Sequence, residues 1–226
     1  MLSKEDVLEK ANGYDFEAVR EYIEQGGNTE IYDGSGNSLL SALLAGYYWK
    51  IFANDSDELK FHEEHEDDEE SDTHVCRYCR MPLEDRPQPI KEQVDYLVGK
   101  GISVNAVGWK EAEKYQEYAP AVQTPLFHSV VYCDYCMTKY LLELGADPGQ
   151  KLFSDGDYDL DGYEDWLLDH MDYYIMDGHR GDAMELDIEI AALLMHYGLD
   201  QWDGGYCIDV DKENRTIQGH GPVMMF

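Results

Sequence analysis

The chain has 226 residues, of which 48 are acidic and 17 basic, so its formal net charge is −31. A hydrophobic content of 43% is too high for a disordered acidic tail, and the charge argues against direct binding to nucleic acid or to anionic membranes. No stretch approaches the roughly 20 apolar residues of a membrane span. The N-terminus lacks the basic and apolar segments of an export signal, so we expect a cytoplasmic protein.

The expected helices end in a common pattern. In four places an apolar pair stands shortly before a glycine, which is typical of a helix that stops at a left-handed C-cap residue. We therefore predict four units, each made of a helix, a tight turn, a second helix and a glycine stop. The four glycines are Gly26, Gly101, Gly145 and Gly198.

The unit at residues 124–148 has the clearest pattern, TPLFHSVVYCDYCMTKYLLELGADP. Thr124-Pro125 is typical of a helix start, because proline is favoured in the first turn. The other units follow less regular sequences. The predicted helices cover, in chain order, residues 3–12, 15–25, a segment from Ser38, a segment from near Pro89, two helices within 124–144, then 163–176 and 184–197.

Residues 124–148 resemble the core of an ankyrin repeat, with its TPLHxA start and its LLxxGAD end. The histidine position of the family holds Phe127, and His128 stands one place later. Asp33, Gly36 and Ser38 match the D-x-x-G-x-T register of the family after the first unit. An ordinary helical bundle is the alternative.

The resemblance implies an all-α, ankyrin-like helical repeat solenoid with hairpin loops and a long insertion in the second unit. It divides the chain into units at about 3–37, 38–123 (with an acidic insertion at 54–88), 124–162 and 163–200, followed by a C-terminal cap at 201–226 that includes a short hairpin.

Four of the five cysteines form two C-x-x-C pairs, Cys76/Cys79 and Cys133/Cys136. The first pair lies in the insertion that leaves the turn of unit two, and the second lies at the corresponding turn of unit three. Neighbouring turns in such a stack are about 10 Å apart. We therefore predict one structural zinc site with four thiolate ligands, which orders the insertion. Unliganded thiols, a disulfide, or His74 in place of one cysteine are the alternatives.

Two further acidic segments suggest ion binding. Residues 54–74 contain 11 acids around His62 and His65. A solvated, self-repelling loop is the favoured interpretation, and a divalent-cation or basic-partner site is the alternative. Asp157, Asp159 and Asp161 match the opening of a calcium loop, but the twelfth position is Leu168 where a glutamate is needed. An acidic hairpin turn is the alternative there.

The sequence lacks familiar catalytic motifs, so we expect a non-enzymatic protein–protein interaction module. Its acidic, tyrosine-bearing face is expected to bind a basic protein partner, for example as an antitoxin-like inhibitor of a cationic nuclease. The alternative is a metal-responsive regulator in which zinc or calcium occupancy controls that face. The residues expected to bind the partner are Tyr32, Tyr115, Tyr118, Asp155 and Tyr158.

Overall fold

The computed structural model describes residues 2–52, 78–115, 122–150, 152 and parts of 189–198, together with the backbone of 207–211 and 216–220. Its helices are α1 (Lys4–Asn12), α2 (Phe16–Glu24), α3 (Leu39–Phe52), the 3-10 helix η1 (Leu83–Asp85), α5 (Ile90–Gly99), α6 (Trp109–Tyr115), α7 (Pro125–Val131) and α8 (Tyr135–Glu143). The described residues of 189–196 are also helical. Over these ranges the chain is mostly helical, as expected.

The strands β1 (Cys207–Asp211) and β2 (Thr216–His220) form an antiparallel hairpin near the C-terminus, with Cys207 opposite His220. A hairpin here, with Cys207 in one strand, is what the sequence predicted. In the described ranges no helix combines the length and the apolar character that a membrane crossing needs.

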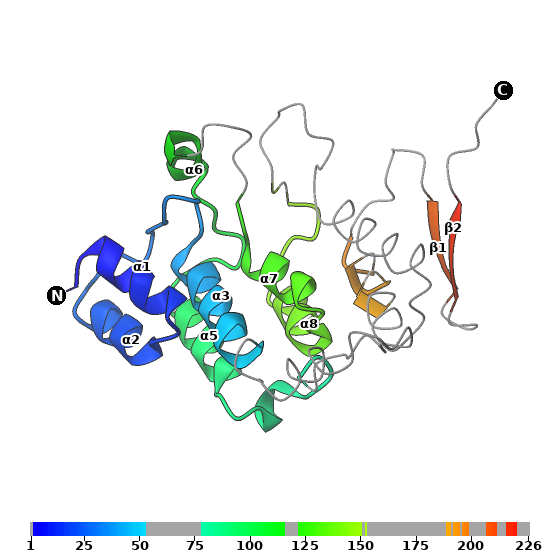
Figure 1. The fold of residues 1–226 in the computed structure, drawn as a ribbon, viewed down its shortest axis with the longest axis horizontal. Coiled ribbons are helices and arrows are strands. Elements are labelled where there is room, and N and C mark those ends of the chain that lie inside the picture. The colour runs from blue at the N-terminus through cyan, green and yellow to red at the C-terminus, as the bar shows by residue number, and fades with distance from the viewer. Residues whose placement is uncertain are drawn as a thin grey trace, which may run out of the picture.

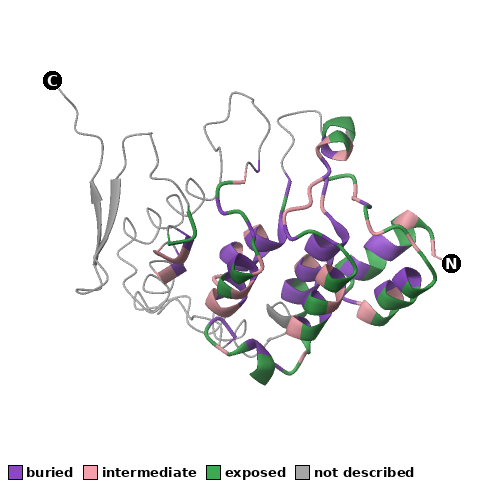
Figure 2. Cartoon of the chain, turned by 180° about the vertical axis from the view of Figure 1, so that it is seen from behind, coloured by how far each residue is buried: buried purple, intermediate pink, exposed green. Residues whose placement is uncertain are grey.

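The helices are arranged as pairs that stack side by side. Helix α1 packs on α2, α3 packs on α5, and α7 packs on α8. Helix α3 also contacts α1 on one side and α7 on the other, so the first helices of the pairs form a row (Figure 1). One continuous hydrophobic core joins the pairs, and buried residues occupy the helix sides that face one another (Figure 2).

The second helix of each described pair ends in the same way. The glycine after the helix has a left-handed backbone, and its N–H bonds to the carbonyl three residues earlier, while the next N–H bonds to the carbonyl five residues earlier. This Schellman geometry confirms the glycine stops predicted from the sequence. The φ angles are 83° at Gly26, 90° at Gly101 and 92° at Gly145, and Gly198 has φ 106°.

The tight turns inside the units are also alike. Tyr14 and Cys133 are the non-glycine residues with positive φ, 54° and 51°, in the described part of the chain. Each is followed by an aspartate whose side chain caps the second helix: Asp15 accepts from the N–H of Ala18, and Asp134 accepts from that of Met137. The unusual backbone of Cys133 is therefore a feature of the repeated turn.

The loops between units lie beside one another above the helices (Figure 1). Asp33 closes the first loop by accepting hydrogen bonds from the N–H groups of Ser35 and Asn37. Asn37 forms a β-bridge with Val107 of the next loop. That next loop contains the short helix α6, which the sequence analysis did not predict.

Several predicted elements lie outside the described residues. They are the helix at 163–176, the acidic segment at 54–74 and most of the C-terminal segment around the hairpin.

Candidate functional site

The inserted segment returns to the stack through a buried ion pair. Arg86 donates one hydrogen bond to each carboxylate oxygen of Asp134, with an N–O distance of 2.6 Å in both. The two side chains are fully buried. The hydroxyl of Tyr48 in α3 donates to the same carboxylate at a distance of 2.9 Å. Arg86 also donates to the hydroxyl of Tyr47 at a distance of 3.1 Å. The remaining guanidinium donors reach the backbone carbonyls of Tyr78 and Met81.

The cation and the two tyrosines of this polar network keep one charge state, because their surroundings shift their pKa values upward. Burial alone would lower the pKa of Arg86, but its hydrogen bonds to Asp134 and the charge of that carboxylate outweigh burial and raise it. Burial, with the nearby Asp134 charge, raises the pKa of Tyr48, and burial raises that of Tyr47 to about 12. Arg86 is therefore a cation and both tyrosines are neutral at every physiological pH. The network joins the inserted segment to α3 and to the start of α8.

Three of the four predicted zinc ligands, Cys79, Cys133 and Cys136, belong to the described residues and lie near this network. Cys79 is buried, and its Sγ lies 3.5 Å from the carbonyl oxygen of Tyr132. Tyr132 directly precedes Cys133 in the chain. Cys136 is partly buried on the first turn of α8, and burial followed by the Asp134 charge raises the pKa of its thiol. Cys79 of the inserted pair thus lies beside the turn that carries the second pair.

The described residues include three of the four predicted zinc ligands. Cys76 lies outside the described residues, and among those described no three His, Cys, Asp or Glu side chains form a ready-made metal cluster. The zinc site stays a prediction.

Of the other predicted site residues, only Tyr32 and Tyr115 lie in the described part of the chain. Tyr32 is partly buried, its ring lies against Gly108, and burial raises the pKa of its hydroxyl. Tyr115 is the last residue of α6. Outside the described residues lie Tyr118, Asp155, Tyr158 and the predicted calcium ligands Asp157, Asp159 and Asp161. These remain predictions.

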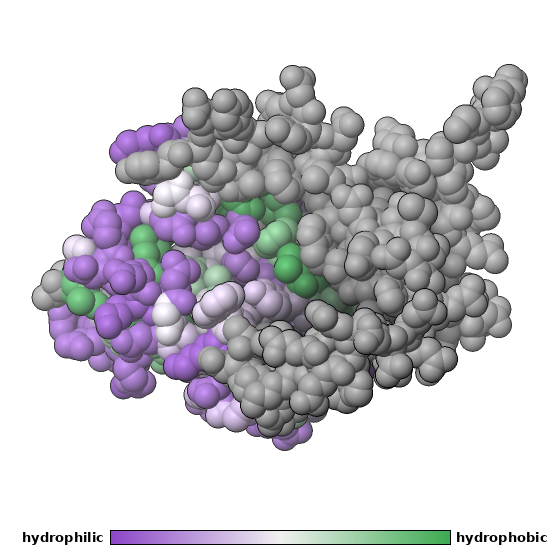
Figure 3. Space-filling view, in the orientation of Figure 1, coloured by the Kyte–Doolittle hydropathy of each residue, from purple (hydrophilic) through white to green (hydrophobic). Residues whose placement is uncertain are grey.

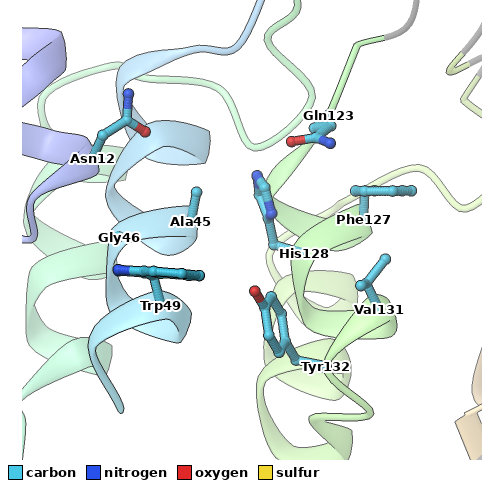
Figure 4. Close-up of a pocket in the computed structure, with 9 residues that line it drawn as sticks. All are labelled: Asn12, Ala45, Gly46, Trp49, Gln123, Phe127, His128, Val131 and Tyr132. Carbon is cyan, nitrogen blue, oxygen red and sulfur yellow. The ribbon is translucent and has the colours of Figure 1, made fainter. Parts of the chain in front are cut away.

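A pocket of about 360 Å³ lies between α3 and α7, the first helices of adjacent pairs (Figure 4). Gly46 allows α3 to lie close against the end of α1, which brings Asn12 to the pocket, because a Cβ at Gly46 would overlap the backbone of Ala11 and Asn12. In Figure 3 the apolar, green surface gathers over α7, next to paler residues over α3. The lining residues are Asn12, Ala45, Gly46, Trp49, Gln123, Phe127, His128, Val131 and Tyr132.

Trp49 is the most conspicuous residue of the pocket, because 71% of it is exposed. Only one other large hydrophobic residue in the described part, Tyr197 at 37%, is classed as exposed. The sequence predicts partner anchors on loops, and Trp49 is not among them. Little in the sequence distinguishes Trp49, because α3 is apolar on all sides and its large side chains before Trp49 are buried, among them Leu40, Leu44 and Tyr48.

His128 lies deepest in the pocket. It is 5% exposed, and its Nε2 has no hydrogen-bond partner among the described residues. Burial lowers the pKa of its imidazole to about 4, so the ring is neutral at pH 7. Figure 4 shows the ring extending from α7 into the space between α7 and α3, with Trp49 on the opposite side.

The charge of the chain is unevenly distributed along it. Residues 2–52, 78–115 and 122–150 contain 18 acids and 11 bases, a net charge of −7, whereas the whole chain carries −31. None of the nine residues that line the pocket is an acid or a lysine or arginine. The pocket is therefore an uncharged, aromatic site in a strongly acidic protein.

A comparison of the chain with protein-family models, curated proteins and solved structures gives no match in any of the three.

Proposed function

We propose that the chain is a non-enzymatic, ankyrin-like protein-binding module that holds a basic partner against the groove between α3 and α7. The observation that carries the proposal is Trp49, a largely exposed tryptophan at the rim of a pocket between two stacked helix pairs. Tryptophan is enriched among the few residues that carry most of the binding energy of protein interfaces, so an exposed tryptophan beside a pocket is a candidate anchor for a partner.

The ankyrin-like arrangement is supported by the repeated geometry. Three helix pairs stack through α1, α3 and α7, and their second helices end in the same Schellman motif. The turns before α2 and α8 share a left-handed residue followed by an aspartate cap. Such a stack presents its first helices and loops along one continuous side, which suits an extended partner surface.

A basic partner is supported by the charge of the whole chain. A net charge of −31 attracts cations over a Debye length of about 8 Å at physiological salt and repels acidic surfaces. Most of this charge lies outside the helix pairs. We propose that it accelerates the encounter, while the uncharged pocket provides the close contact.

The predicted zinc belongs to the same proposal as a structural element. The contact between Cys79 and the Tyr132 carbonyl supports it, because one cysteine of the inserted pair then lies beside the turn of Cys133 and Cys136. The metal would hold the insertion on the stack together with the Arg86–Asp134 ion pair.

The test compares two exposed aromatic residues. A basic partner is isolated from the native host, and its affinity is measured for the wild type, Trp49→Ala and Tyr197→Ala. We expect Trp49→Ala to weaken binding more than tenfold and Tyr197→Ala to leave it nearly unchanged, since Tyr197 does not line the pocket. The association rate should fall steeply with added salt. Equal effects of the two substitutions would refute the assignment of the groove.

A further inference from the structure

We infer that the pocket between α3 and α7 receives one arginine side chain of the partner. This inference rests on the proposed function, and it identifies a guanidinium as the partner group that enters the pocket. It follows from three features of the pocket, which are an unpaired buried imidazole, aromatic walls and a polar rim.

The first feature is His128. A buried polar atom without a hydrogen bond costs about 1–3 kcal/mol, and Nε2 of His128 lacks a partner among the described residues. The neutral ring can accept a hydrogen bond at one nitrogen. A ligand that donates to Nε2 would recover that cost, whereas an aliphatic ligand would seal the unpaired atom away from water.

The second feature is the aromatic lining. Trp49 projects from α3 and Tyr132 from α7, on opposite sides of the space (Figure 4). The Tyr132 ring is stacked on Tyr48, with centroids 4.6 Å apart and planes within 8°, so its orientation is fixed. Flat aromatic faces favour a planar cation, which gains cation–π attraction as well as stacking.

The third feature is the polar rim. Asn12 and Gln123 stand at one end of the pocket, above His128 in Figure 4, and both are exposed residues. Their side-chain carbonyls can accept hydrogen bonds from a ligand that already donates to His128. A guanidinium has five N–H donors in one plane and can satisfy several such acceptors together.

Other occupants fit less well. A carboxylate or phosphate would enter against the net charge of −31 and find no cation in the lining. A lysine has the correct charge, but it offers a strongly hydrated ammonium with no flat face for Trp49. The volume of about 360 Å³ is at the lower end of ligand pockets, which span about 300–1,000 Å³, and suits a single side chain.

The test titrates the full-length protein with N-acetyl-arginine amide while NMR follows the His128 imidazole and the Trp49 indole. Matched titrations use N-acetyl-lysine amide, which has the same charge, and N-acetyl-norleucine amide, which is uncharged. We expect a saturable response to the arginine compound, at least fivefold weaker for lysine, and none for norleucine. Trp49→Ala and His128→Asn should each weaken the arginine response at least fivefold, with folding checked by circular dichroism.

The outcomes separate this inference from the proposed function. Equal responses to arginine and lysine, or an arginine response that survives in the folded His128→Asn variant, would overturn the guanidinium assignment. If the compounds fail but the isolated partner still depends on Trp49, the groove binds protein and the arginine inference alone is wrong. If the compounds fail and the affinity of the partner is also unchanged in Trp49→Ala, both the arginine inference and the proposed function are wrong.

Discussion

The guanidinium of Arg86 and the carboxylate of Asp134 are joined by two hydrogen bonds of 2.6 Å in a site with no exposed side-chain surface. Asp134 therefore has two tasks, since it also caps α8 through the N–H of Met137. The equivalent cap in the first unit, Asp15, has only a half-exposed lysine partner, with Lys10 Nζ 3.4 Å away. This difference allows the ion pair to be tested separately from the helix cap.

We predict that Asp134→Asn destabilises the protein by about 3–5 kcal/mol, because asparagine keeps the cap but leaves the Arg86 charge buried and uncompensated. The matched change Asp15→Asn should cost less than about 1 kcal/mol. Urea unfolding of the two variants measures both values. The double variant Arg86→Met with Asp134→Asn should be more stable than Asp134→Asn alone, and the ion-pair account fails if it is not.

A second prediction concerns two glycines that are two residues apart. Gly101 has φ 90° and Gly99 lies in the last turn of α5, and an added Cβ meets nothing within 4 Å at either position. Only backbone conformation therefore distinguishes them. Gly101→Ala should destabilise by about 1 kcal/mol, because alanine resists a left-handed backbone, whereas Gly99→Ala should stabilise by about 0.5–1 kcal/mol. Thermal unfolding should shift in opposite directions, and a shared direction would contradict the Schellman assignment.

Much of the helical framework could be predicted from the sequence because its signals are local. The glycine stops, the proline before α5 and the Thr124-Pro125 start each depend on a few neighbouring residues. Helix α6 was missed because WKEAEKY is short and largely charged, without an apolar stripe.

The site was harder to predict because its contacts are distant along the chain. Arg86 and Asp134 are 48 residues apart, and Tyr48 and Asp134 are 86 apart. A single sequence reveals Asp134 as a helix cap but cannot reveal which cation it meets. The same holds for the pocket, since His128 and Trp49 lie on helices separated by the whole insertion.

A third prediction tests the zinc site through the turn geometry. We expect purified protein to hold about one zinc per chain and to lose it when Cys76 and Cys79 are both changed to serine. Cys133→Gly is the sharper variant. Glycine relieves the left-handed backbone at φ 51°, so it should stabilise a chain without metal but destabilise one in which Cys133 is a ligand. We expect loss of zinc and of stability. Higher stability with an unchanged metal content would refute the site.

A fourth prediction concerns pH and His128. The pKa of this imidazole is about 4 in the folded protein, while its ordinary value is 6.5, so the unfolded chain binds the proton more readily. Stability from this residue is fully present above pH 6.5 and is lost as the pH falls toward 4. Between pH 7 and pH 5 the loss should be about 2 kcal/mol.

The measurement compares the unfolding free energy of the wild type and of His128→Gln across that window. Carboxylates elsewhere titrate in both proteins, so only the difference between their profiles reports His128. We expect the glutamine variant to lose about 2 kcal/mol less than the wild type on acidification from pH 7 to pH 5. His196→Gln, at an exposed position, is the control and should follow the wild type. Parallel profiles for the wild type and His128→Gln would show that the folded protein does not lower the pKa of this imidazole, and would contradict the dry, buried ring from which arginine binding is inferred.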